Sequence, residues 1–244
     1  MSLRRTAATA RRVLTQLRHD PRTVAMMLVV PCVLVGLLAW IFHGTPTFDE
    51  IGAPLLGIFP FVVMFLVTSV ATLRERTSGT LERLLTMPIG KLDLLVGYAV
   101  AFGVVAVVQG VLVTTLSLTV YGLDVAGPTW LLLLVAVVDA VLGMALGLFV
   151  SAFASTEFQA VQFMPAFVLP QFLLCGLLVP RDEMPDVLHA ISSVLPLSYA
   201  VDALRAITTD STVAMETWVD LAVVSGCTVL ALALGAVTLR RRTP

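Results

Sequence analysis

The segment RERTSGTLERLLTMPIGKLD, residues 74–93, carries seven charged residues and separates two long apolar stretches. The sequence before it, IGAPLLGIFPFVVMFLVTSVATL (residues 51–73), contains no charged residue, and neither do residues 94–123 after it. A helix needs about 20 apolar residues to cross the hydrocarbon core of a bilayer, so each flank is long enough to span a membrane. The charged segment is therefore predicted to be a water-exposed connection between two membrane-spanning helices.

The composition of the whole chain is typical of a membrane protein. Hydrophobic residues make up 58% of the 244 residues and charged residues only 13%, a balance unusual for a soluble domain. The runs that we expect to span the membrane are Thr23–Phe48, Ile51–Leu73, Leu94–Leu123, Val125–Thr156, Phe158–Pro180 and Leu221–Leu239. We therefore predict an all-α polytopic membrane protein with six transmembrane helices, in which residues 1–244 form a single transmembrane domain.

Basic residues are distributed unevenly around these runs, and an excess of Lys and Arg marks cytoplasmic segments. Thirteen of the fifteen lie before the first run, between the second and third, or after the sixth. We therefore expect both termini and residues 74–93 to be cytoplasmic, in a plasma or inner cell membrane. The net charge of −1 says nothing about nucleic acid, and we expect no nucleic-acid partner.

Two segments outside the expected spans have helical patterns of their own. Residues 1–22 place apolar side chains on one face and arginines around the other, a pattern typical of a helix on a membrane surface with anionic lipids. Alternatively, these arginines only set the topology. Residues 181–217 have helical spacing that Pro196 interrupts, which predicts an outer helical hairpin that dips into the outer leaflet.

Asp139 is the one charged residue inside an expected span. A charge there costs about 2.5–3.5 kcal/mol on insertion scales, so the carboxyl group should face protein or water, or be protonated. Candidate partners lie in the preceding span: Gln109, Thr114 and Thr115. A structural polar contact and a proton relay are both open. In the same run, Gly143 and Gly147 are spaced to permit close contact with another helix.

The fifth run mixes polar and aromatic residues more densely than the others. Phe163, Phe167 and Gln171 recur at i, i+4 and i+8 and share one face of a helix, and Pro165 and Pro170 interrupt that helix. Such a face either packs against protein or lines a wetted cavity.

The sequence lacks the motifs of an ATPase or a hydrolase. Lys91 does not belong to a phosphate-binding loop, because Leu85 occupies the first glycine position of that motif and Leu92 follows the lysine. The three histidines are isolated and match no zinc or nucleophile motif. We predict no catalytic residue, no metal site and no cofactor in this chain, and expect a membrane component that obtains its energy elsewhere.

Within residues 74–93, the pattern predicts a short helix. Ser78 or Thr80 can cap its start, and Pro88 with Gly90 ends it. This helix is too short to span a bilayer, and it has the shape of a rigid handle that a cytoplasmic partner pushes. The alternative is an ordinary charged loop that enforces topology.

These segments resemble one family: the membrane subunits of type-2 ATP-binding-cassette exporters, in particular the daunorubicin-resistance-like drug and lipid exporters. RERTSGTLERLLTMPIGKLDLLVGY (residues 74–98) is similar to the family's cytoplasmic motif, and LPLSYAVDALRA (residues 195–206) is similar to its outer motif. The six-span layout also agrees. Two positions differ: Leu195 stands where asparagine is frequent, and Thr77-Ser78 stand where a charged pair is common.

The resemblance implies a permease subunit that exports a hydrophobic or amphipathic cargo, such as a drug or a lipid. Two permease subunits, identical or related, would act with two ATPase subunits that hold ATP and magnesium, and membrane lipid would surround the complex. The alternatives are export of a glycan or lipid-linked precursor, or a membrane channel or scaffold without a transport role.

The resemblance also implies three sets of site residues. The ATPase-coupling helix would contain Arg74, Glu75, Arg76, Gly79, Thr80, Leu81, Glu82 and Arg83, and residues 1–22 would brace it. The translocation path, lined in this family by the first, second and fifth spans, would include Phe61, Phe65, Phe163, Phe167 and Gln171. The outer hairpin would be organised by Pro196, Tyr199, Asp202 and Arg205.

Overall fold

The structure, a computed structural model, describes residues 3–45, 47–77 and 91–238. These residues contain helices and no strand, which confirms the predicted all-α class. The helices are α1 (Leu3–His19), α2 (Pro21–Ile41), α3 (Thr47–Thr77), α5 (Lys91–Thr119), α6 (Thr129–Ser151), α7 (Glu157–Leu174), α8 (Asp186–Ser192), α9 (Pro196–Thr209) and α10 (Met215–Thr238), with the 3-10 helix η1 (Arg181–Glu183) before α8.

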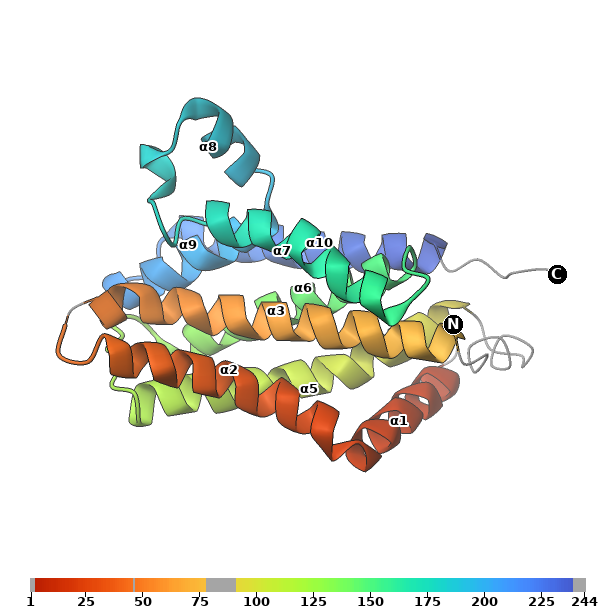
Figure 1. The fold of residues 1–244 in the computed structure, drawn as a ribbon. Coiled ribbons are helices and arrows are strands. Elements are labelled where there is room, and N and C mark those ends of the chain that lie inside the picture. The colour runs from red at the N-terminus through yellow and green to blue at the C-terminus, as the bar shows by residue number, and fades with distance from the viewer. Residues whose placement is uncertain (1–2, 46, 78–90, 239–244) are drawn as a thin grey trace.

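Most of these helices form an elongated bundle (Figure 1). Both chain termini lie at one end, which we call the termini end; α8 and α9 lie toward the other, which we call the hairpin end (Figure 1). Among the described residues, α2, α3, α5, α6 and α10 are long and apolar enough to cross a membrane. The polytopic membrane fold is thereby confirmed.

The expected fifth span, Phe158–Pro180, needs correction. Its helix α7 has 18 residues and ends at Leu174, because Gly176 has a φ of +90° that ends the helical path. Its three glutamines and two prolines also make it less apolar than the other long helices. The pair α8 and α9, bent by 89° at the break between them, is long and apolar enough only when taken together, as a broken span or a re-entrant loop.

Two other expected boundaries were too wide. The first apolar run was extended to Phe48, but α2 ends at Ile41 and Phe48 already belongs to α3. Gly44, whose φ is +77°, lies in the turn between these helices. The fourth run was expected to begin at Val125, but α6 begins only at Thr129, directly after Pro128.

The close contact predicted for Gly143 and Gly147 is confirmed, and its partner is α3. A Cβ atom on Gly143 would overlap the carbonyl oxygen of Phe61, and one on Gly147 would overlap the carbonyl oxygen of Phe65. Only glycine allows the two backbones to approach this closely. The contact between α3 and α6 therefore forms the centre of the bundle.

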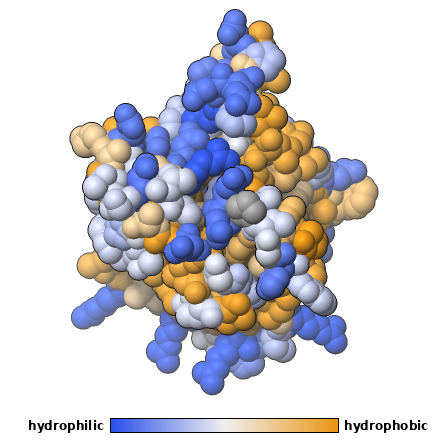
Figure 2. Space-filling view, turned by 90° about the vertical axis from the view of Figure 1, so that its left-hand side faces the viewer, coloured by the Kyte–Doolittle hydropathy of each residue, from blue (hydrophilic) through white to orange (hydrophobic). Residues whose placement is uncertain are grey.

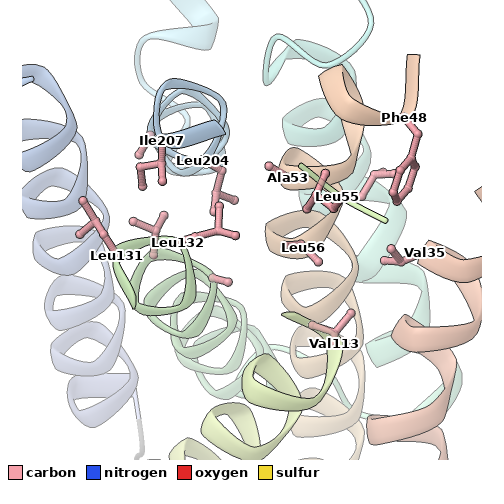
Figure 3. Packing of buried hydrophobic residues seen from close by; sticks show 14 of the residues in the cluster. Val35, Phe48, Ala53, Leu55, Leu56, Val113, Leu131, Leu132, Leu204 and Ile207 are labelled. Atoms are coloured by element: carbon pink, nitrogen blue, oxygen red, sulfur yellow. The ribbon is translucent and has the colours of Figure 1, made fainter. Parts of the chain in front are cut away.

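Helix α9 belongs to the core and is more than a cover over the bundle. Figure 3 shows its Leu204 and Ile207 pointing toward Leu131 and Leu132 of α6, next to a group of side chains from α3 that includes Leu56. These residues are buried because the apolar positions of α9 follow the 3.6-residue helical period. Half of the expected outer hairpin is thus fixed to the bundle, whereas α8 projects sideways from it (Figure 1).

Helix α1 is amphipathic, as predicted, and packs against α5. Its buried face includes Ala10, Val13 and Leu17. Gly97 of α5 makes room for this face, since a Cβ atom there would lie 2.5 Å from the Cβ atom of Thr9. The chain then turns sharply into α2 (Figure 1).

Candidate functional site

Two neighbouring residues at the end of α3 join it to two other helices. Arg74 donates two hydrogen bonds to Glu157 at the start of α7, from Nε to Oε1 at 2.7 Å and from Nη2 to Oε2 at 3.0 Å. Glu75 accepts a hydrogen bond of 2.9 Å from Nη2 of Arg12 in α1. The pairing of Arg74 with Glu157 uses both carboxylate oxygens and fixes the orientation of the two side chains.

Arg12 also connects α1 to α5. Its Nη2 donates to the hydroxyl of Tyr98 at 2.8 Å, and its guanidinium carbon lies 5.9 Å from the centre of the Tyr98 ring. Sequence reasoning treated Arg12 as one of several surface arginines and missed this role. Its position beside the apolar stripe of the helix, next to Val13, was the available signal.

The predicted ATPase-coupling residues are only partly described. Arg74 and Glu75 occupy the last turns of α3, and Arg76 lies in the same helix. Gly79, Thr80, Leu81, Glu82 and Arg83 lie outside the described residues. The coupling helix therefore stays a prediction. The structure describes the contacts of Arg74 and Glu75, the first two residues of the segment in which it is expected.

A cavity of about 380 Å³ opens beside these ion pairs, between α1, α2, α3 and α5 at the termini end. Its wall is apolar along Met26, Val67 and Phe102, and polar where Asp20 and Arg74 contribute. Asp20 caps α2: it accepts hydrogen bonds from the Thr23 amide and from the Thr23 hydroxyl, which lowers the pKa of Asp20 below its usual range. The cap keeps this carboxylate charged.

The structure separates the residues expected along the translocation path. Phe61 and Phe65 have no exposed surface, because they belong to a buried cluster with residues of α6, α7, α9 and α10. Phe163 and Phe167 lie on α7 with their rings edge to face at 6.3 Å, and 44% of Phe167 is exposed. Gln171 is buried and donates a hydrogen bond to the Phe167 carbonyl oxygen at 3.1 Å. In this conformation only the phenylalanines on α7 have surface available to a cargo.

All four residues expected in the outer hairpin lie on α9, and two of them, Tyr199 and Asp202, contact Arg181, which was not selected from the sequence. Arg181 pairs with Asp202, donates to the Ser193 hydroxyl at 3.2 Å, and lies 5.2 Å from the centre of the Tyr199 ring. The Tyr199 hydroxyl donates to the Ser193 carbonyl oxygen at 2.7 Å. Arg205 donates to the Gly176 carbonyl oxygen at 3.0 Å and so connects α9 to the turn after α7.

The start of α9 follows from its sequence. Pro196 is the first helical residue, a position that suits its fixed φ. Leu195 occupies the capping position without a side-chain hydrogen bond, which is the consequence of having leucine there in place of asparagine. Figure 2 views the hairpin end of the molecule and shows hydrophilic side chains over the projecting hairpin and the centre of the face.

Asp139 has none of the partners expected for it. Its side chain is fully buried, and neither carboxyl oxygen has a hydrogen-bond partner among the described residues. Gln109 instead donates to the Met27 carbonyl oxygen at 2.7 Å and ties α5 to α2. Asp139 faces α3 at Gly57, where a Cβ atom would lie 3.0 Å from its Oδ2. The proposed polar contact with the preceding span is therefore wrong in this conformation.

A bundle with several helices that are long and apolar enough to cross a membrane defines a multi-pass membrane protein. The chain belongs to the ABC-2 type transporter family, whose sequence profile matches residues 5–208. Several relatives of the chain are named as permeases of ABC transporters. The resemblance inferred from residues 74–98 and 195–206 is thereby confirmed.

Two relatives are bacterial permeases. The probable multidrug ABC transporter permease YbhR of Escherichia coli K12 is 29% identical over 153 residues, which are 63% of this chain and 42% of the relative. The linearmycin resistance permease protein LnrN of Bacillus subtilis is 25% identical over 148 residues, 60% of this chain and 38% of the relative. The chain thus matches less than half the length of these relatives.

Proposed function

We propose that this permease exports a hydrophobic or amphipathic cargo, such as a drug, as one of two permease subunits driven by two separate ATPase subunits. Residues 74–93 would be the contact with the ATPase, on the cytoplasmic side of the cell's inner or plasma membrane. Two relatives are named for multidrug transport and linearmycin resistance, which supports a drug-like cargo. The observation that carries the proposal is the double connection at the end of α3.

This connection gives a mechanical route from the coupling segment into the membrane. Arg74 and Glu75 are the first two residues of the segment, and their ion pairs lead to α7 and α1 respectively. A force on the segment therefore acts on α3, α1 and α7 together. Such a force drives transport if the ATPase contacts the segment differently in the inward-facing and outward-facing states.

The surface of α7 supports a second permease subunit and a path beside it. Pro165 and Pro170 have no N–H to pair with the carbonyl groups of Val161 and Ala166, and both of those residues are exposed. Lipid tails cannot satisfy free carbonyl groups, whereas protein or a wetted cavity can. Gln162 is exposed on the same helix, so this face is suited to a subunit contact or a translocation path.

The cargo path then runs along α7. Phe163 and Phe167 are its aromatic contacts, and the few charges near them favour an apolar molecule. Phe61 and Phe65 are not included, because a side chain without exposed surface makes no contact with cargo in this conformation.

The test is reconstitution of the chain in vesicles with a candidate ABC ATPase subunit, using a fluorescent lipophilic dye as the probe. We expect dye export only when both proteins and ATP are present. Arg74→Glu should lower the dye exported per ATP hydrolysed, and the double change Arg74→Glu with Glu157→Arg should restore it. Arg11→Glu, an exposed change on α1, is the control. Equal dye export without nucleotide would overturn the proposal.

A further inference from the structure

The cavity at the termini end has two different walls. Its interior is formed by apolar side chains of α2, α3 and α5, among them Met26, Leu66 and Phe102. Three charged residues contribute to its lining: Asp20 before α2, and Arg74 and Glu75 on α3, of which Glu75 is paired with Arg12 of α1. A volume of about 380 Å³ is within the range of small-molecule sites, and an apolar interior with a few polar groups is the usual composition of such sites. The cavity is therefore suited to an amphipathic ligand.

Asp20 and Arg74 attract each other without forming an ion pair, and each can still form further hydrogen bonds. Arg74 uses two of its N–H groups on Glu157, and a guanidinium has about five. Each oxygen of Asp20 accepts one hydrogen bond from Thr23, and an ionised carboxylate has about four acceptor sites in total. A ligand with a negative and a positive group side by side matches this arrangement.

We propose that the cavity binds one phospholipid with a zwitterionic headgroup and a primary ammonium, the chemistry of phosphatidylethanolamine. The phosphate interacts with Arg74, the ammonium donates to Asp20, and one acyl chain lies in the apolar interior. A primary ammonium has N–H groups for Asp20, whereas the quaternary ammonium of a choline headgroup has none. The lipid comes from the leaflet that adjoins the termini end. This site does not depend on the proposed transport cycle.

The location of the cavity gives the lipid a structural consequence. The cavity lies in the angle between α1 and α2, next to the contact of Glu75 with Arg12. A lipid there fills the space that this angle leaves open and contacts the residues that hold α1 to α3. Its binding should therefore stabilise the termini end of the bundle.

The experiment measures lipid retention by the purified chain in nanodiscs that contain equal amounts of phosphatidylethanolamine and phosphatidylcholine, followed by native mass spectrometry. We expect wild type to retain the ethanolamine lipid over the choline lipid by about fivefold, the upper size of one solvent-accessible charge contact. Asp20→Asn should reduce this preference to about equal retention, and it should leave α2 intact because asparagine caps a helix as well as aspartate does.

A matched pair of variants separates the cavity from the rest of the surface. Ala71 lines the cavity, and Ala71→Trp should remove the retained lipid. Ala25 is exposed on α2 outside the lining, and Ala25→Trp should retain the lipid as wild type does. Equal retention of both lipids by wild type would overturn the proposal, as would unchanged retention in Ala71→Trp. In nanodiscs that also contain an equal amount of phosphatidylglycerol, stronger retention of that lipid would also overturn the proposal, because general attraction to the arginines of α1 would then explain the binding. No nucleotide or ATPase is present, so the result is independent of the transport proposal.

Discussion

The contact between α3 and α6 allows a quantitative test of how the bundle is held together. In Gly143→Ala, the new methyl group would overlap the Phe61 carbonyl oxygen and lie 2.9 Å from the Phe61 Cα atom. These are backbone atoms, so no side chain can rotate away to make room. The two helices must move apart by about 1 Å at the Phe61 carbonyl oxygen, since an ordinary contact of a Cβ atom is 3.4–4 Å.

The expected cost follows from this displacement. Forcing one extra methyl group into a packed contact destabilises a protein by about 1–3 kcal/mol, and a gap of about 0.5–1 Å forfeits a quarter to a half of the dispersion energy of each contact. Gly147→Ala acts on the same helix pair at Phe65 and should cost a similar amount. The double variant should cost less than the sum, because one separation of α3 from α6 makes room for both methyl groups.

The measurement is the free energy of unfolding in detergent micelles, obtained by titration with a denaturing detergent. Gly103→Ala in α5 is the matched control, because a Cβ atom there meets nothing within 4 Å. This control should be neutral or slightly stabilising, by up to about 1 kcal/mol, owing to the higher helix propensity of alanine. If Gly143→Ala unfolds with the same free energy as Gly103→Ala, the close backbone contact is not a source of stability and the reasoning fails.

Two further predictions concern the termini end. Gly97→Leu should lift α1 from α5, because its side chain would collide with Thr9; amide exchange in residues 3–19 should then rise well above that of the control Gly226→Leu, whose site is open. Unchanged exchange would contradict this packing. The second concerns acid: the pKa of Asp20 lies below its ordinary value of 3.8, so its cap stabilises the fold above that value and is lost as the pH falls through the lowered pKa. Unfolding measured from about pH 6 to about pH 3 should show a loss of at most about 1 kcal/mol in wild type that is absent from Asp20→Asn; the same loss in both would refute it.

The outer hairpin shows how far sequence motifs locate a site. The motif around Tyr199 and Arg205 was selected from sequence, and in the structure both residues bind backbone carbonyl oxygens, Tyr199 that of Ser193 and Arg205 that of Gly176. Arg181 was missed because its partner Asp202 lies 21 positions away, on a separate helix. Nothing local in the sequence indicates which distant helix a charged residue will face.

The buried phenylalanines show the same limit at the centre of the bundle. The sequence indicates that Phe61 and Phe65 belong to an apolar helix, but it does not indicate which side of that helix another helix will cover. Residues of α6, α7, α9 and α10 form one buried cluster with these phenylalanines and enclose them. The partners expected for Asp139 were wrong for a related reason. They were sought in the helix that precedes it in the chain, whereas the side chain faces α3.

The sequence by itself determined that this chain is a helical membrane protein, where most of its membrane-crossing helices lie, and which family it belongs to. These properties follow from local composition and short motifs. An apolar run long enough to cross lipid must form a helix, because only then are its backbone N–H and C=O groups hydrogen-bonded within the run itself. Only the tertiary structure decided the pairing of Arg12 with Glu75, the enclosure of the α3 phenylalanines and the cavity between α1 and α2. These depend on the angles at which helices meet, and contacts between residues far apart in the chain set those angles.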